Sequence, residues 1–131
     1  MTFRILVVDD NRISRETLQT LLMHSGCQVD CVDNAIQALS KVGHVQYDLV
    51  ITGFFMPVID GPHLTGLLKT RHDLAHIPVI MLSTRSTSDV AAAMDMNLLS
   101  LFLRKPLNCD AKRLLLEHIS TLIVATSGKA A

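Results

Sequence analysis

Short apolar runs alternate along this chain with longer segments in which apolar residues recur every three or four positions. The short runs are typical of β-strands that are buried on both faces, whereas the three-to-four spacing is typical of amphipathic helices. This alternation predicts a parallel sheet covered by helices, and therefore an α/β fold. The predicted strands are Arg4–Val8, Gln28–Val32, Leu49–Thr52, Val79–Leu82 and Ser100–Leu103.

A helical segment follows each predicted strand. The first has the clearest ends, because Asn11 can cap its N-terminus and Gly26 can terminate it. The second is expected over 34–41, and the third over 63–70 after a turn at 60–62. The inward stripe of the first helix is expected to contain Ile13, Thr17, Leu18, Leu21 and Leu22.

The last two helical segments are indicated by a cap and by a stripe. Ser86 or Thr87 can cap a fourth helix that passes through the alanines at 91–93. A fifth helix is expected over 110–124. Its inward positions are Ala111, Leu115, Ile119 and Leu122.

Length and composition agree with a single domain. With 131 residues and 49% apolar content, the chain can bury one sizeable core. The segment 126–131 (TSGKAA) has neither periodicity nor bulk. We therefore expect one folded domain over 1–125, followed by a flexible tail or the start of a linker over 126–131.

Charge and cysteine content narrow the functional classes. Twelve basic and twelve acidic residues cancel, so direct nucleic-acid binding is not expected and protein partners are favoured. No apolar run reaches the length of a membrane span, and the N-terminus lacks the pattern of a signal peptide. The three cysteines have no paired spacing that would indicate a zinc site or a disulfide framework. These features predict a cytoplasmic protein without membrane contact.

An α/β sheet usually presents its functional residues at the carboxyl ends of its strands. Here the first strand ends in two aspartates at 9–10, the fourth in Ser-Thr at 83–84 and the fifth in Arg-Lys-Pro at 104–106. Two adjacent carboxylates repel each other, and Mg²⁺ or a lysine such as Lys105 can hold both ionised. The two aspartates could instead only stabilise the N-terminus of the first helix. The pair therefore indicates a functional site mainly when it is taken together with Ser83 and Lys105.

Four motifs, in order, resemble those of the response-regulator receiver domain, the phosphoaccepting module of bacterial two-component signalling. They are ILVVDDN at 5–11, YDLVITGFFMPVIDG at 47–61, IPVIMLST at 77–84 and FLRKP at 102–106, and the resemblance covers about residues 3–124. It implies a flavodoxin-like (βα)5 fold, doubly wound around a five-stranded parallel sheet in the order 2-1-3-4-5. It also implies phosphoryl transfer from a histidine kinase to an aspartate, with Mg²⁺ bound at an acidic pair.

The resemblance assigns roles to individual residues. Asp9 and Asp10 match the acidic pair, and the backbone carbonyl of Phe55 matches a further metal ligand. Ser83 matches the hydroxyl that follows the phosphoryl group, and Lys105 matches the lysine that neutralises it.

The segment before Lys105 departs from the family in its apolar content. Phe102 falls at the family's aromatic switch position, and the peptide bond at 105–106 matches a cis bond of the family. Leu98, Leu99 and Leu101 stand where the family tends to have Gly-Ala and acidic residues. A buried final strand explains part of this run; if exposed, these leucines would form with Phe102 an apolar surface for constitutive protein contact.

Gly53 occupies the position that the resemblance assigns to the reactive aspartate. An acyl phosphate forms on a carboxylate, which glycine lacks. Thr52 should point to the opposite side of the strand, and Asp60 lies beyond the turn that follows it, so neither is expected to replace the missing nucleophile.

The missing carboxylate also changes the charge of the site. Asp9, Asp10 and Lys105 sum to about −1, whereas the resembled family's unphosphorylated site sums to about −2. We expect Lys105 to pair with Asp9 or Asp10, and Mg²⁺ to bind weakly at most. No other cofactor is expected.

Together these features predict an atypical receiver, or pseudo-receiver, which is not an enzyme and acts through protein contacts without aspartyl phosphorylation. Its expected partners are a histidine kinase, another receiver or an output domain, and a homodimer is possible. One alternative is an ordinary phosphoaccepting receiver whose aspartate is replaced by Gly53 in this sequence alone. A flavodoxin-like cofactor binder would share the fold, but two carboxylates follow the first strand where a phosphate-cradling loop would be needed.

Overall fold

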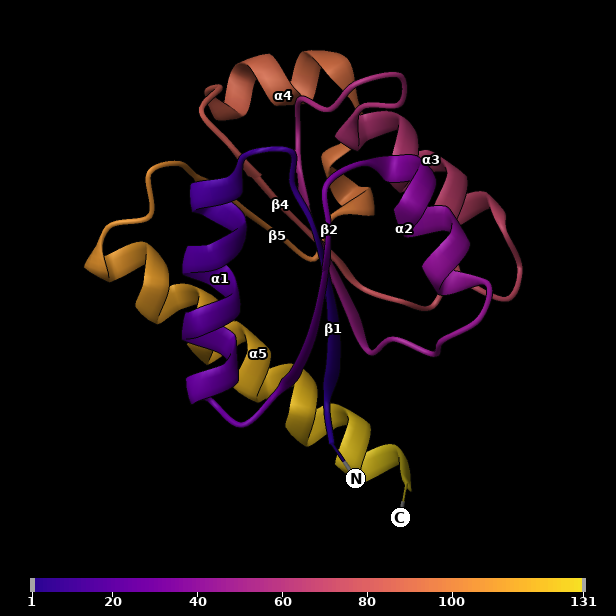
Figure 1. Cartoon of the computed structure of the whole chain (residues 1–131), viewed down its shortest axis with the longest axis vertical. Coiled ribbons are helices and arrows are strands. Elements are labelled where there is room, and N and C mark those ends of the chain that lie inside the picture. Colours follow the sequence, from indigo (N-terminus) through magenta and orange to yellow (C-terminus); the bar gives the residue numbers. More distant parts are fainter. Residues whose placement is uncertain (1, 131) are drawn as a thin grey trace.

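The structure is a computed structural model that describes the backbone of residues 2–130 and the side chains of residues 2–126. Its strands are β1 (Arg4–Val8), β2 (Gln28–Val32), β3 (Leu49–Gly53), β4 (Val79–Ser83) and β5 (Leu101–Arg104). All pair in parallel within one sheet, in the order β2-β1-β3-β4-β5 (Figure 1). The predicted α/β fold and its strand order are confirmed.

Helices cover both faces of this sheet. They are α1 (Arg12–His24), α2 (Ala35–Val42), α3 (Gly61–Thr70), α4 (Thr87–Ala93), the 3₁₀ helix η1 (Met96–Leu98) and α5 (Cys109–Ala130). Leu18 of α1 and Leu115 of α5 belong to one buried cluster, whereas Ala38 of α2 and Leu64 of α3 belong to the other. Figure 1 accordingly shows α1 and α5 on one side of the sheet and α2 and α3 on the opposite side.

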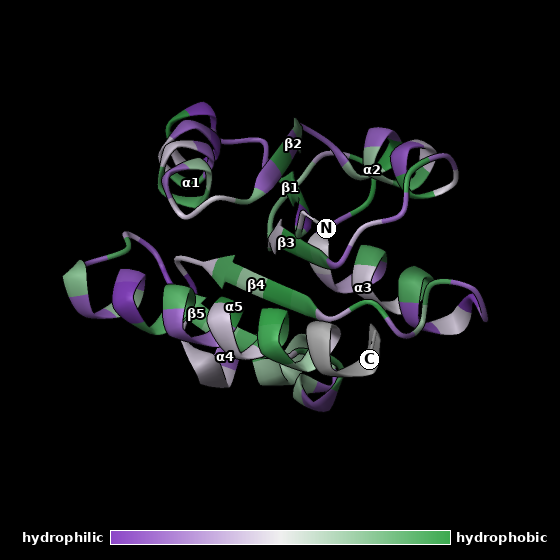
Figure 2. Cartoon of the chain, turned by 90° about the horizontal axis from the view of Figure 1, so that it is seen from below, coloured by the Kyte–Doolittle hydropathy of each residue, from purple (hydrophilic) through white to green (hydrophobic). Residues whose placement is uncertain are grey.

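The central strands lie between these two layers. Every residue of β3 and of β4 is buried. Figure 2 shows both strands as hydrophobic ribbons between helices that carry hydrophilic residues. This burial on both faces explains why the strands have continuous apolar runs instead of alternating ones.

Helix α1 has the ends that the sequence predicted. The Asn11 side chain accepts a hydrogen bond from the Ser14 backbone N–H at 2.9 Å, as expected of an N-cap. At the other end Gly26 adopts a left-handed φ of 84°, and its N–H donates to the Met23 carbonyl. The Cys27 N–H donates to the Leu22 carbonyl, which completes a Schellman termination.

The prediction that Ile13 and Thr17 face the core is wrong, because Ile13 is 76% exposed and Thr17 is exposed as well. Leu18 and Leu22 are the buried residues of α1. At 3.6 residues per turn, Ile13 lies about 140° around the helix axis from Leu18, which is too far to share its face. In α5, by contrast, the predicted inward positions do pack against the core: Ala111, Leu115, Ile119 and Leu122.

Several boundaries differ from the predictions by one or two residues. Strands β3 and β4 each include one residue more than expected, because the ladder still pairs Gly53 with Leu82 and Ser83 with Arg104. Helix α3 begins at Gly61, since the Asp60 carboxylate accepts the His63 N–H at 2.8 Å and caps it.

Helix α5 continues beyond its predicted end at Val124. It extends to Ala130, and the Thr126 hydroxyl donates to the Leu122 carbonyl at 2.9 Å inside it. No proline interrupts this segment, so the backbone can remain helical. The segment expected to be a flexible tail is therefore helical as far as Ala130. Ala131 lies outside the described residues. The division into a domain and a linker stays a prediction.

In the part of the chain that the structure describes, no helix combines the length and the apolar character needed to cross a membrane.

Candidate functional site

Four strands bring the predicted site residues to one edge of the sheet. Asp9 directly follows β1, Gly53 ends β3, Ser83 ends β4 and Lys105 directly follows β5. Since the strands are parallel, their carboxyl ends lie side by side. Residues far apart in the sequence thus share one site, as the resemblance implied.

Asp9 is the most constrained carboxylate of this site. Its side chain is only 2% exposed, and its Oδ2 atom accepts a hydrogen bond from Lys105 Nζ at 2.5 Å. Its Oδ1 atom accepts the Asn11 backbone N–H at 2.9 Å. Asp10 is exposed. The prediction that Lys105 pairs with one of the two aspartates is confirmed, and the partner is Asp9.

Arg15 also contributes to this corner of the site, although no motif in the sequence includes it. Its Nη1 atom donates to the Asp9 backbone carbonyl at 2.8 Å. The guanidinium therefore holds the segment between β1 and α1 from the helix side. Its only signal in the sequence is its place one turn into that helix, which many surface arginines share.

Gly53 lies directly against the Asp9 carboxylate. A Cβ built on Gly53 would lie 3.3 Å from Asp9 Cγ and Oδ2, and 3.4 Å from Oδ1. The Gly53 carbonyl accepts the Thr52 hydroxyl at 2.9 Å, and a Cβ on Gly61 would come within 2.1 Å of the same carbonyl oxygen. The end of β3 is thus packed closely on both its side-chain and carbonyl sides.

The polar residues near Gly53 are engaged in other contacts. Thr52 is 1% exposed, and its hydroxyl donates to the Gly53 carbonyl. Asp60 caps α3. Ser83 is 3% exposed, and its Oγ atom accepts the Arg85 N–H at 3.0 Å.

Phe54, Phe55 and Arg85 pack together on the side of the site next to β3. Phe55 is 49% exposed and packs edge-on against Phe54, with 4.8 Å between the ring centroids. The Arg85 guanidinium lies 5.0 Å from the centre of the Phe55 ring, within the range of a cation–π contact. The resemblance assigns a role to the Phe55 carbonyl only, whereas the contact of its ring with Arg85 depends on how β3 and β4 are placed.

The hollow at this edge has a volume of about 350 Å³. Its lining includes Asp10, Phe55, Ser83 and Lys105. Asp9 is not among the lining residues, which agrees with its burial beneath Lys105. The hollow can therefore offer one free carboxylate, a hydroxyl and a lysine that is already paired.

Protein contacts compete with Mg²⁺ for part of the matched donor set. Mg²⁺ is held in proteins by carboxylate and other oxygen ligands at close to ideal geometry. Both Asp9 oxygens already accept hydrogen bonds, which leaves Asp10 and the Phe55 carbonyl as the remaining matched donors. Among residues 2–126, no group of three or more His, Cys, Asp or Glu side chains is arranged to hold a metal ion.

Part of the leucine run near β5 packs against the core, and an apolar contact surface at this run stays a prediction. Leu98, Leu99, Leu101 and Phe102 are all half-buried. Leu99 packs against the cluster on the α2 and α3 side, whereas Leu101 packs against the cluster on the α1 and α5 side. Because the sheet separates the two clusters, these side chains point in opposite directions. The peptide bond between Lys105 and Pro106 is cis, as the resemblance implied.

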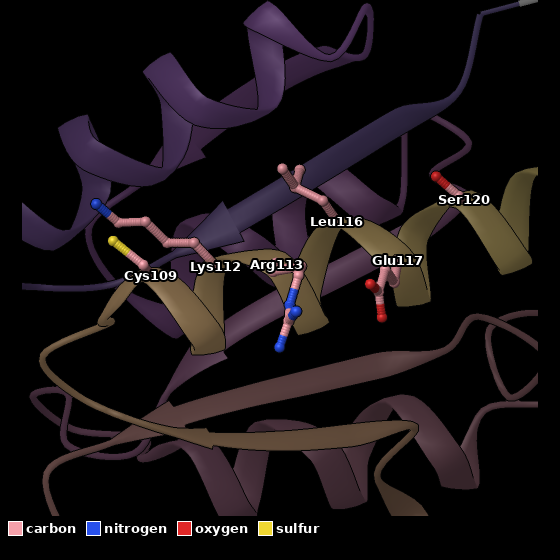
Figure 3. A pocket seen from close by; sticks show the side chains of 6 residues that line it. All are labelled: Cys109, Lys112, Arg113, Leu116, Glu117 and Ser120. Carbon is pink, nitrogen blue, oxygen red and sulfur yellow. The ribbon is translucent and has the colours of Figure 1, made fainter.

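A second hollow, of about 440 Å³, lies along α5 (Figure 3). All its lining residues belong to this one helix, among them Cys109, Lys112 and Arg113. It is therefore a surface feature of a single element, and none of the residues assigned to the carboxyl edge lines it.

Comparison with known protein families and sequences agrees with this geometry. The response regulator receiver domain matches residues 5–119. The chain is 35% identical over 91 residues to the response regulator protein FleR of Pseudomonas aeruginosa, covering 70% of this chain and 19% of that protein. It is 33% identical over 127 residues to the sensory/regulatory protein RpfC of Xanthomonas campestris pv. campestris, covering 95% of this chain and 17% of that protein. The chain therefore spans less than a fifth of the length of these two relatives.

Solved structures show the same fold. The signal receiver domain of a signal transduction histidine kinase from Syntrophus aciditrophicus superposes with a TM-score of 0.83 and 30% identity, covering 95% of this chain and 92% of that one. The chemotaxis response regulator CheY4 of Vibrio cholerae superposes with a TM-score of 0.81 and 22% identity, covering 91% of this chain and 99% of that one. At that lower identity, the second likeness supports the fold alone.

Proposed function

This chain belongs to the response regulator receiver domain family, and from that membership we propose that it is a pseudo-receiver of two-component signalling. It acts through protein contacts and is not phosphorylated at the position of the usual aspartate. The observation that carries the proposal is Gly53 at the end of β3, on the same edge of the sheet as Asp9, Ser83 and Lys105 at the ends of β1, β4 and β5.

The chemistry of phosphoryl transfer supports this proposal. The acyl phosphate of a receiver forms on a carboxylate oxygen, and Gly53 provides none. Asp9 is 2% exposed and both its oxygens accept hydrogen bonds, so it is a poor substitute nucleophile. Asp10 is exposed, but it lies on the segment after β1 and not at the end of β3.

The proposed partners are proteins. Receiver domains interact with partners such as kinases or output domains, and we infer a histidine kinase, another receiver or an output domain here, with a homodimer possible. FleR is named as a response regulator and RpfC as a sensory/regulatory protein, and this chain matches only 19% and 17% of their lengths. Matching so small a part of these relatives supports a module that works together with other domains.

We also propose that the chain has no enzymatic activity of its own and works in the cytoplasm. Cys27, Cys31 and Cys109 are all free thiols. Free thiols in place of a disulfide framework are usual in a reducing compartment.

The mass of the protein after incubation with acetyl phosphate and Mg²⁺ tests the proposal. We expect no phosphoryl adduct on the native chain, since the acceptor carboxylate is missing. A phosphoaccepting receiver treated in parallel shows that the reagent is active. A stoichiometric, hydroxylamine-labile adduct on the native chain would mean that another carboxylate is the acceptor and would overturn the proposal.

The second candidate is an ordinary phosphoaccepting receiver whose aspartate was lost recently or by engineering. It is favoured by one observation, namely that Asp9, Asp10, Ser83 and Lys105 all remain at the carboxyl edge. Prompt acyl-phosphate formation by Gly53→Asp would support it. The restored side chain would lie against Asp9, because its Cβ would be 3.3 Å from the Asp9 carboxylate.

A further inference from the structure

A third hollow lies between α1 and the segment that joins β5 to α5, and we propose that it binds a short-chain aliphatic carboxylate. Its lining includes residues of α1, the end of β4 and the start of α5. We call it the α1–α5 hollow. The inference goes beyond the proposed function, because it concerns a small ligand and not the protein contacts of the receiver.

The wall of the α1–α5 hollow is mainly aliphatic. The hollow has a volume of about 270 Å³, and its apolar lining residues are Ile13, Leu18, Leu82, Pro106 and Leu107. Leu18 and Leu82 are each 1% exposed, so the floor of the hollow is the core itself. Sites for small ligands have this character, with an apolar cavity and a few polar groups that orient the ligand.

Ile13 adds apolar surface that the core does not bury. Its side chain is 76% exposed, although it lies in the first turn of α1 and lines the hollow. An aliphatic chain that filled the hollow would cover part of this side chain. Removal of that apolar surface from water would favour binding.

The polar part of the lining is positively charged. It consists of Ser14, Thr17, Lys105 and Lys112, and none of the described residues that line the hollow is acidic. Lys105 is paired with Asp9, whereas Lys112 takes part in none of the ion pairs formed among residues 2–126. Figure 3 shows the Lys112 side chain on a different side of α5 from Arg113 and Glu117. One unpaired ammonium group beside an apolar hollow matches a monoanion with an apolar body.

The size of the hollow selects a short ligand. Its volume equals that of about nine water molecules, at about 30 Å³ each in the liquid. Hexanoate is close to this size, whereas acetate would leave most of the hollow unfilled and dodecanoate would extend beyond it.

The α1–α5 hollow adjoins the hollow at the carboxyl edge but is distinct from it. The two share Lys105 and Pro106 in their linings. Asp10 and Phe55 line the hollow at the carboxyl edge only, and Lys112 lines the α1–α5 hollow and not the other. These residues therefore report which of the two hollows a ligand enters.

Titration of the isotope-labelled native chain with sodium hexanoate, followed by NMR, tests the site. We expect saturable shifts at Ile13, Leu107 and Lys112, with smaller shifts at Asp10 and Phe55. Hexanol lacks the carboxylate and acetate lacks the chain, so each should bind at least about tenfold more weakly. The proposal would be overturned by the absence of saturable shifts, by shifts centred on Asp10 and Phe55, or by equal binding of hexanol.

Lys112→Met tests the contribution of the charge. We expect it to weaken hexanoate binding about tenfold, because it replaces the ammonium group with an apolar side chain. Lys41→Met is the matched control, since Lys41 is exposed and lies on α2, on the other side of the sheet (Figure 1). Equal weakening by the two changes would indicate a general effect of net charge and would overturn the site.

Ile13→Ala tests the contribution of the apolar wall. We expect it to weaken the binding of hexanoate several-fold, because the ligand covers less apolar surface. Ile36→Ala is the matched control, since Ile36 is a 55% exposed isoleucine of α2. Both changes remove exposed side chains, so the core stays intact. Unchanged hexanoate affinity in Ile13→Ala would contradict the proposal.

The ligand site and the proposed function fail separately. A phosphoryl adduct on the native chain, together with specific hexanoate binding, would overturn the pseudo-receiver and leave the ligand site. The absence of both would overturn the ligand site and leave the pseudo-receiver.

Discussion

At the scale of single residues, the surrounding backbone restricts which side chain fits at Gly26, Gly61 and Val58. Gly26 has a left-handed φ and ends α1, whereas Gly61 is required because a Cβ there would lie 2.1 Å from the Gly53 carbonyl oxygen. Val58 is the opposite case, since it is a β-branched residue at a φ of 69° with a side chain that is 88% exposed. It bears a strained backbone and gains little from packing.

Val58→Gly should therefore stabilise the protein. Relief of the left-handed conformation is worth about 1 kcal/mol, and little buried surface is lost. Urea unfolding of the native chain and the variant measures the difference. Val124→Gly is the control, because Val124 is 70% exposed but lies in a helix, where glycine should destabilise instead. A decrease in unfolding free energy for Val58→Gly would show that the valine side chain makes a stabilising contact.

At the scale of secondary-structure elements, polar side chains determine where elements begin and how they are joined. Asn34, Asp60 and Ser86 cap α2, α3 and α4 through hydrogen bonds to backbone N–H groups. Lys69, near the end of α3, has a different role. Its Nζ atom donates to the Ala75 and Ile77 carbonyls at 3.1 and 2.6 Å, which joins the helix to the loop before β4.

The ionisation of Lys69 should make the free energy of unfolding depend on pH. Burial lowers the pKa of Lys69 below its usual value of 10.5. In the interval between the folded pKa and the unfolded value, the unfolded chain binds more protons, so stability rises with pH. The cost of burying the charged amine is complete below the folded pKa and disappears above the unfolded one.

The measurement is the unfolding free energy as a function of pH for the native chain and for Lys69→Met, which has no titrating group at this position. The difference between the two should shift in favour of the native chain as the pH rises toward 10.5. A pH-independent difference would mean that Lys69 has the same pKa in the folded and unfolded chains.

At the scale of the whole molecule, the carboxyl edge joins β1, β3, β4 and β5 through contacts made by protein groups alone. The chain has twelve basic and twelve acidic residues, so no overall charge draws cations to the site. Asp9 is already paired with Lys105, which leaves about −1 of net charge among Asp9, Asp10 and Lys105. A ligand stabilises a protein only to the extent that it binds the folded state.

Millimolar Mg²⁺ should therefore change the melting temperature no more than NaCl of equal ionic strength. NMR spectra should show weak, non-saturating shifts at Asp10 and Phe55. Lys105→Met is the informative variant, because it removes the partner of Asp9 and changes the net charge of the site to about −2. The melting temperature and the NMR shifts of this variant should therefore respond more strongly to Mg²⁺. Strong, saturable shifts in the native chain would contradict weak binding.

Much of the secondary structure could be predicted from the sequence, because the interactions that determine it are local. Apolar runs and three-to-four periodicity predicted the five strands and five α-helices that residues 2–130 form, since burial on two faces or on one face leaves those patterns. Asn11 and Gly26 predicted the ends of α1, because capping involves residues three or four positions apart. Glycine at position 53 was likewise visible in the sequence, once the surrounding motif had indicated what that position normally holds.

Other features were decided only by the tertiary structure, because they depend on distances between residues far apart in the chain. Asp9 and Lys105 are separated by 96 positions, and only the placement of β1 beside β3 shows that Asp9, and not Asp10, lies over Gly53. The opposite directions of Leu99 and Leu101 depend on which face of the sheet each meets. Sequence pattern specifies which residues an element can bury, whereas contact between elements selects which atoms meet.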